Sequence, residues 1–168
     1  MRPGVLLPPI DIRLLRDPGH LCALGFGTGL APYAPGTCGT LAAIPIYLLM
    51  ANWRWQVYLA VVVLLYGFGV WCTGRLGRVL GVHDHPAIVW DEIVGFLLAM
   101  LAAPHVWWAI PLGFVLFRVF DILKPYPIDA IDRQVPGGHG VMLDDLLAGV
   151  FTFIVLQTVY ALMPLSAM

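Results

Sequence analysis

The sequence contains few charged residues for its length. Asp, Glu, Lys and Arg make up only 11% of the 168 residues, whereas soluble domains carry about 25%. Nine Lys and Arg residues are balanced by ten Asp and Glu residues, and the net charge of −1 argues against the basic surface that nucleic-acid-binding proteins use. Because 60% of the residues are hydrophobic, the composition predicts a protein embedded in a membrane.

Cysteine is also scarce. Cys22, Cys38 and Cys72 have no metal-binding spacing, and we interpret them as small apolar fillers. Cys72 and Arg78 do match the C-x5-R spacing of cysteine phosphatases. A thiolate nucleophile needs an electropositive, partly exposed loop, whereas Cys72 ends a long apolar run. We therefore predict no thiol chemistry.

Uncharged apolar segments predict the fold class. Residues 55–73 and 146–165 contain 19 and 20 residues without a charge, and each run is long enough to cross a bilayer as a helix. The shorter segment 41–51 either crosses at a tilt or re-enters. We predict an all-α, polytopic helical membrane protein. It has four to five apolar helical segments, a glycine-rich N-terminal loop and a single membrane-embedded domain over residues 1–168.

Residues 93–117 contain no Asp, Glu, Lys or Arg and have two interpretations. They form either one long span or a hairpin that turns around Pro104, since proline interrupts a helix. The hairpin predicts helices at about 40–51, 55–73, 88–103, 106–123 and 141–163. It places eight of the nine basic residues on one side, with only Arg54 opposite, and an excess of Lys and Arg marks the cytoplasmic side. We prefer the hairpin because it also gathers all ten acidic residues there.

Five carboxylates lie at the ends of segments that the hairpin brings together: Asp91, Glu92, Asp121, Asp144 and Asp145. Carboxylates at the edge of the hydrocarbon are costly unless they are paired or bind a metal. Hard oxygen ligands suit Mg²⁺, so we predict that these five residues form a catalytic magnesium site. The alternative is interfacial charge and helix capping. We favour that alternative for four other acids, Asp11, Asp17, Asp129 and Asp132.

Two features predict a binding site for phosphate. Residues 25–40 read GFGTGLAPYAPGTCGT, and such a loop directs backbone N–H groups and hydroxyls at an anion before an apolar helix. Its three threonines are Thr28, Thr37 and Thr40. Arg118 and Lys124 flank Asp121 at a spacing of three, which places all three on one helix face. The alternative for residues 25–40 is an ordinary turn-rich loop at the entry to the membrane. The alternative for Arg118 and Lys124 is that they extend from a helix end to the membrane interface.

Residues 82–92, VHDHPAIVWDE, offer a further candidate cluster. His83, Asp84 and His85 have the chemistry of metal ligands. We favour the alternative that Asp84 caps the following helix, with Pro86 in its first turn. His139, in the glycine-rich segment 137–140, is either a proton donor near the site or a polar loop residue.

Four blocks, taken in order, resemble the phosphatidylglycerophosphatase A family over about residues 22–160. They are GFGTGLAPYAPGTCGT at 25–40, VHDHPAIVWDEIVGF at 82–96, FRVFDILKPYPI at 117–128 and GGHGVMLDDLLAGV at 137–150. The resemblance implies Mg²⁺-dependent hydrolysis of phosphatidylglycerophosphate to phosphatidylglycerol and phosphate. It also implies a helical protein of the bacterial inner membrane with lipids as its partners.

Two other functions are compatible with parts of this pattern. A related lipid phosphomonoester phosphatase would share the same chemistry on another headgroup. A small cation carrier would instead line a pathway with acids at mid-membrane depth. The carboxylates here fall at the ends of the predicted segments, which favours the phosphatase.

Overall fold

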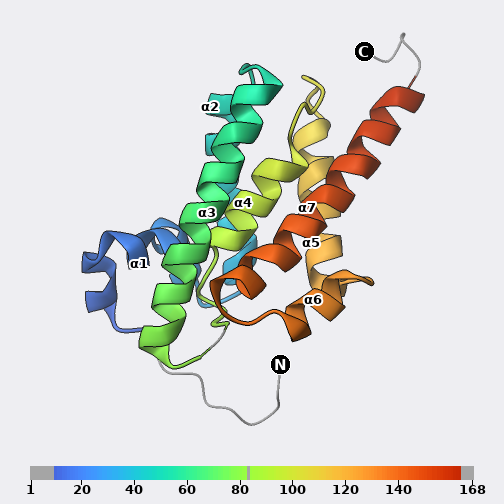
Figure 1. The fold of residues 1–168 in the computed structure, drawn as a ribbon. Coiled ribbons are helices and arrows are strands. Elements are labelled where there is room, and N and C mark those ends of the chain that lie inside the picture. Colours follow the sequence, from blue (N-terminus) through green and yellow to red (C-terminus); the bar gives the residue numbers. More distant parts are fainter. Residues whose placement is uncertain (1–9, 83, 164–168) are drawn as a thin grey trace.

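The computed structural model describes residues 10–82 and 84–163, and within these ranges the chain forms helices and turns without a strand. The order along the chain is η1 (Ile12–Arg16), α1 (Pro18–Ala23), η2 (Gly25–Leu30), α2 (Pro35–Met50), α3 (Trp55–Leu80), α4 (Trp90–Ala99), α5 (Ala109–Leu123), α6 (Ile128–Gln134) and α7 (Gly137–Leu162). The predicted all-α fold is confirmed (Figure 1).

Two helices, α3 and α7, are long and apolar enough to cross a membrane. Each has 26 residues, which corresponds to about 39 Å of helix, against a hydrocarbon core of about 30 Å. Helix α3 extends beyond the predicted 55–73. It ends at Gly81, whose φ of 66° is the left-handed conformation typical of a glycine that follows a helix.

Helix α4 is the central helix of the bundle and lies between α3 and α7 in Figure 1. Eight of its ten residues are buried, and the acid Asp91 is one of them. It is shorter than the predicted 88–103, because the chain turns between Met100 and Trp108 before α5 begins. The predicted turn is therefore present. At about 15 Å, however, α4 alone is too short to cross a bilayer.

Close backbone contact between α4 and α7 sets the geometry of the acidic residues. A Cβ atom on Gly149 would lie 2.4 Å from the carbonyl oxygen of Gly95, so no larger residue fits between the two helices as they stand. Asp91 precedes Gly95 by four residues and Asp145 precedes Gly149 by four, so each acid shares a helix face with its glycine. The crossing consequently places the two carboxylates side by side.

Several elements differ from the sequence-based expectation. Helix α2 begins at Pro35 instead of about residue 40, and the short helices η1, α1, η2 and α6 were not predicted. Each of these four has seven residues or fewer, which is too short for a periodic apolar pattern to reveal. Helix α6 packs against α7 at the end where α5 finishes (Figure 1).

Candidate active site

Three of the five predicted carboxylates form a compact group. One carboxylate oxygen from each of Asp91, Glu92 and Asp145 lies within 4.8 Å of the other two. Asp91 and Glu92 come from the first turn of α4, and Asp145 comes from α7. Mg²⁺ holds its oxygen ligands at about 2.1 Å, so two opposite ligands are about 4.2 Å apart. The spacing of the three carboxylates is close to what one such ion requires.

The same group contains buried oxygens that lack a partner. Asp91 and Asp145 are 8% and 3% exposed. Asp91 Oδ1 and Glu92 Oε2 have no hydrogen bond within the described part of the chain. A buried carboxylate oxygen without a partner is costly, and a hard cation would satisfy both atoms. The donor set, its burial and its spacing therefore fit a magnesium ion.

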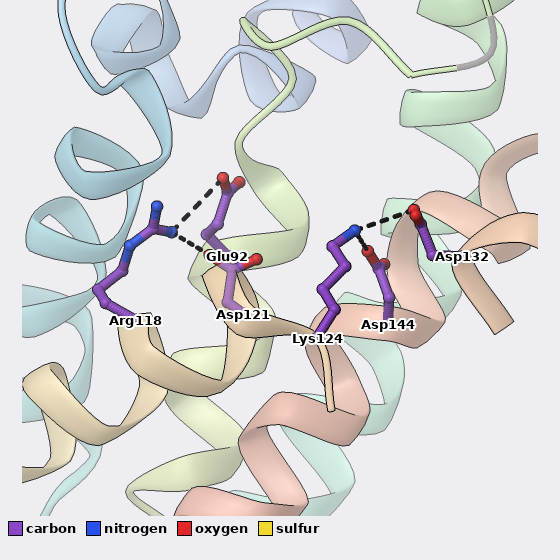
Figure 2. A network of polar contacts seen from close by, with 6 residues as sticks. All are labelled: Glu92, Arg118, Asp121, Lys124, Asp132 and Asp144. Atoms are coloured by element: carbon purple, nitrogen blue, oxygen red, sulfur yellow. Dashed lines mark hydrogen bonds and ion pairs between the residues drawn. The ribbon is translucent and has the colours of Figure 1, made fainter. Parts of the chain in front are cut away.

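Asp121 is not a member of the compact group of Asp91, Glu92 and Asp145. It forms an ion pair with Arg118. Arg118 Nη1 lies 2.5 Å from Asp121 Oδ2 and 3.8 Å from Glu92 Oε1, as Figure 2 shows. Asp121 in turn interacts with Asp145. A single guanidinium thus links the end of α5 to the start of α4, and it places one positive charge at the edge of the acidic group.

Lys124 does not lie on the helix face predicted for it. It ends α5 in a left-handed conformation with φ of 42°, so its side chain leaves the face shared by Arg118 and Asp121. Lys124 Nζ lies 2.5 Å from Asp144 Oδ2 and 2.9 Å from Asp132 Oδ1 (Figure 2). Burial alone would lower the pKa of Lys124, but its interactions with Asp144 and Asp132 raise that pKa above the ordinary value. The lysine is therefore charged and already paired.

The start of α2, which is the end of the glycine-rich segment 25–40, reaches the acidic group. A Cβ atom on Gly36 would lie 2.1 Å from Glu92 Oε1 and 3.1 Å from Arg118 Nη1. This first turn of α2 has no side-chain cap, and uncapped N–H groups at a helix start favour anions. Thr37 lies in the same turn and is half-buried.

Two of the predicted phosphate-binding threonines use their hydroxyls locally. Thr28 donates to the carbonyl oxygen of Gly25 at 2.8 Å, and Thr40 donates to that of Gly36 at 2.9 Å. Thr40 is fully buried inside α2. Both hydroxyl hydrogens are therefore engaged within the loop and the first turns of α2.

The segment before α4 differs from its predicted role. Asp84 does not cap α4, because the helix begins after Val89, and Pro86 lies in a turn instead of the first helical turn. The capping prediction is wrong. Asp84 is exposed and interacts electrostatically with Asp91. His85 is buried, and its Nδ1 accepts a hydrogen bond from the backbone N–H of Ala87 at 3.1 Å.

Two of the remaining candidates, His139 and Cys72, have other surroundings in the structure. His83 lies outside the described residues. His139 is exposed at the start of α7, where its Nδ1 lies 3.1 Å from the Tyr66 hydroxyl. Cys72 is fully buried within α3, which agrees with its interpretation as an apolar filler.

Asp132 is the residue of this network that the sequence did not identify. We expected interfacial charge at this position, yet its carboxylate pairs with Lys124 beside Asp144. No spacing rule could have revealed the contact, because it depends on the turn between α5 and α6. Residues 125–127, Pro-Tyr-Pro, signal that turn in the sequence but do not specify its direction.

Comparison with known proteins identifies the family to which the chain is similar. A protein-family model described as phosphatidylglycerophosphatase A matches residues 21–160. Phosphatidylglycerophosphatase A of Escherichia coli is 47% identical over 82% of this chain and 81% of its own length. The protein of the same name from Haemophilus influenzae is 41% identical over 88% of this chain and 91% of its own length.

A third relative, from Bacteroides thetaiotaomicron, is provisionally named a phosphatidylinositol-3-phosphatase and is 39% identical over 81% of this chain and 89% of its own length. No solved structure matches the chain. The family model covers all the acidic residues of the site, and the chain therefore belongs to the phosphatidylglycerophosphatase A family.

Proposed function

We propose that this chain hydrolyses the phosphomonoester of phosphatidylglycerophosphate to phosphatidylglycerol and inorganic phosphate. Membership of the family and two relatives named for this activity support the substrate. The observation that carries the chemistry is the buried group of Asp91, Glu92 and Asp145, with unpartnered oxygens beside the cation of Arg118. Phosphoryl transfer needs this combination of metal ligands and fixed positive charge.

Asp91, Glu92 and Asp145 hold Mg²⁺ in this proposal. The ion, when bound, polarises a phosphoryl oxygen and lowers the pKa of a bound water. The five predicted carboxylates then divide by role. Asp121 is paired with Arg118 and Asp144 with Lys124, and both ion pairs lie at the edge of the site.

The substrate phosphate binds between Arg118 and the first turn of α2. The guanidinium presents several N–H donors in a fixed plane, which suits phosphate oxygens. The uncapped backbone N–H groups of α2 add a partial positive charge beside Glu92. Thr37 lies in this turn and contributes a hydroxyl, whereas Thr28 and Thr40 maintain its shape.

The protein lies in the bacterial inner membrane with the acidic site on the cytoplasmic side. Apolar side chains point outward from four helices: Leu48 and Leu49 on α2, Val63 and Leu64 on α3, Val115 and Val119 on α5, and Ile154 on α7. Outward apolar surface of this kind suits lipid rather than water. Trp53, Trp55 and Trp107 are exposed at the end opposite the acids, where aromatic residues favour the membrane interface.

The third relative gives a specific reason to consider a second substrate. Its name refers to a phosphatidylinositol 3-phosphate, which is also a lipid phosphomonoester. Phosphate release by the purified protein in detergent should therefore be measured on phosphatidylglycerophosphate and on phosphatidylinositol 3-phosphate in parallel.

We expect release from phosphatidylglycerophosphate with the higher kcat/KM, loss of that release after chelation, and its recovery on adding Mg²⁺. The wild-type protein treated with magnesium-saturated chelator is the control. Full activity in metal-free buffer would contradict the assignment of the three carboxylates. A higher kcat/KM on phosphatidylinositol 3-phosphate would change the assigned substrate but would not contradict the metal site.

A further inference from the structure

Lys124 stands between two carboxylates that come from different helices. Its Nζ contacts Asp132 on α6 and Asp144 on α7, while its own backbone ends α5 (Figure 2). A lysine side chain has four rotatable bonds, and holding it in one conformation costs entropy. Two ionic partners on two different helices restrict that motion more than Asp144 alone could.

Restricting the Lys124 side chain also restricts its ionic partner Asp144. Asp144 is 6% exposed. Its Oδ2 binds Lys124, whereas its Oδ1 is buried and has no hydrogen bond within the described residues. Asp144 also adjoins Asp145, a member of the proposed magnesium group. The orientation of the Asp144 carboxylate is therefore set by Lys124, and the oxygen that is left over is available to a ligand.

We infer that Asp132 is a positioning residue of the active site. It holds the Lys124 ammonium against Asp144 Oδ2, and this contact fixes Asp144 with Oδ1 unengaged beside the proposed metal group. Asp132 touches neither the substrate nor the metal and acts through Lys124. The inference rests on the proposed function, since it assigns Asp132 a part in the same reaction.

Helix α6 supplies a matched control. Asp129 lies on the same helix, its side chain has the same 38% exposure as that of Asp132, and it also forms an ion pair, with Arg133 at 3.3 Å. Arg133 is itself 76% exposed, and within the described residues no ion pair joins Asp129 or Arg133 to the acidic group. If the loss of any negative charge from α6 lowered the rate, Asp129→Asn and Asp132→Asn would lower it equally.

The experiment compares phosphate release from phosphatidylglycerophosphate by the full-length protein carrying Asp132→Asn, Asp132→Glu or Asp129→Asn. Residues that orient groups of a metal site usually contribute about 10–100-fold to activity. We expect Asp132→Asn to lower kcat about tenfold with little change in KM, and Asp129→Asn to stay within about twofold of wild type. Asp132→Glu keeps the charge and should recover most of the rate. All three should share one thermal midpoint.

A double-mutant cycle tests whether Asp132 acts through Lys124. Lys124→Gln should lower kcat by up to about a hundredfold. Adding Asp132→Asn to that variant should change the rate by less than about twofold, because the group that Asp132 positions is already absent. The inference would be overturned if the separate reductions in kcat caused by Lys124→Gln and Asp132→Asn multiplied in the double variant. Equal effects of Asp132→Asn and Asp129→Asn would also overturn it. No release by the wild-type protein would overturn the proposed function as well.

Discussion

Arg118 Nη1 lies 2.5 Å from Asp121 Oδ2, one turn further along α5, and the same nitrogen is 3.8 Å from Glu92 Oε1 at the start of α4. The Arg118 side chain is only 16% exposed. This largely buried guanidinium neutralises Asp121 within the protein. The three carboxylates of Asp91, Glu92 and Asp145 remain as ligands for a metal. Glu92 belongs to these three and also lies beside Arg118, so Arg118 couples the fold of the hairpin to the chemistry of the site.

Replacing Arg118 should therefore affect stability and activity together. Arg118→Met removes the charge and leaves buried acids unpaired, which typically costs about 3–5 kcal/mol. We expect a lower thermal midpoint and no measurable phosphate release. Arg118→Lys keeps the charge but loses the planar fork, so it should fold and turn over at least about tenfold more slowly. A thermal midpoint for Arg118→Met equal to that of wild type would show that the contact is dispensable.

The close crossing of α4 and α7 predicts that a larger residue at Gly149 destabilises the protein. A methyl group at Gly149 would meet the Gly95 carbonyl at 2.4 Å, and that backbone cannot rotate away. Gly149→Ala must separate the helices, at a typical cost of about 1–3 kcal/mol, and this moves Asp145 away from Asp91. Both the thermal midpoint and the rate of phosphate release should fall.

Gly67→Ala is the control for this substitution. Gly67 lies within α3, and a Cβ atom there would meet nothing within 4 Å. The change should be neutral or should stabilise the protein by up to about 1 kcal/mol, since alanine favours helices. If both glycine variants behave alike, close packing at Gly149 does not hold the site together.

The sequence could predict the elements that are long and apolar, and three of the five acids that it grouped together lie close to one another. The 19-residue uncharged run located α3, and the break at Pro104 correctly placed Asp91 and Asp121 at neighbouring helix ends. The direction of Lys124 could not be predicted, because helical spacing assumes that α5 continues, whereas it ends there in a left-handed residue. The contact with Asp132 depends on that turn.

Membrane orientation is tested by reporter fusions. The loops that hold the site and eight of the nine basic residues fall on one side in the hairpin arrangement, which predicts the cytoplasm. A reporter active only in the periplasm should be off when fused at Pro136 and on when fused after Met168. A fusion at Asn52, between α2 and α3, should be on. A periplasmic signal at Pro136 would contradict the orientation.

We propose that Asp91, Glu92 and Asp145 form the metal-binding centre of this phosphatase. The most direct measurement is the rate of phosphate release from phosphatidylglycerophosphate by Asp145→Asn, with Asp11→Asn as the control. Asn keeps the volume of Asp but removes the charge that binds a hard cation. Asp11 is exposed and caps η1 through the backbone N–H of Arg13, a role that Asn also fills.

We expect Asp145→Asn to be inserted and folded but at least about a hundredfold slower than wild type, because losing a ligand exceeds the usual effect of an orienting residue. Asp11→Asn should remain within about twofold. Equal rates for the two variants would contradict the account, since the buried carboxylates would then contribute no more to the reaction than an exposed cap.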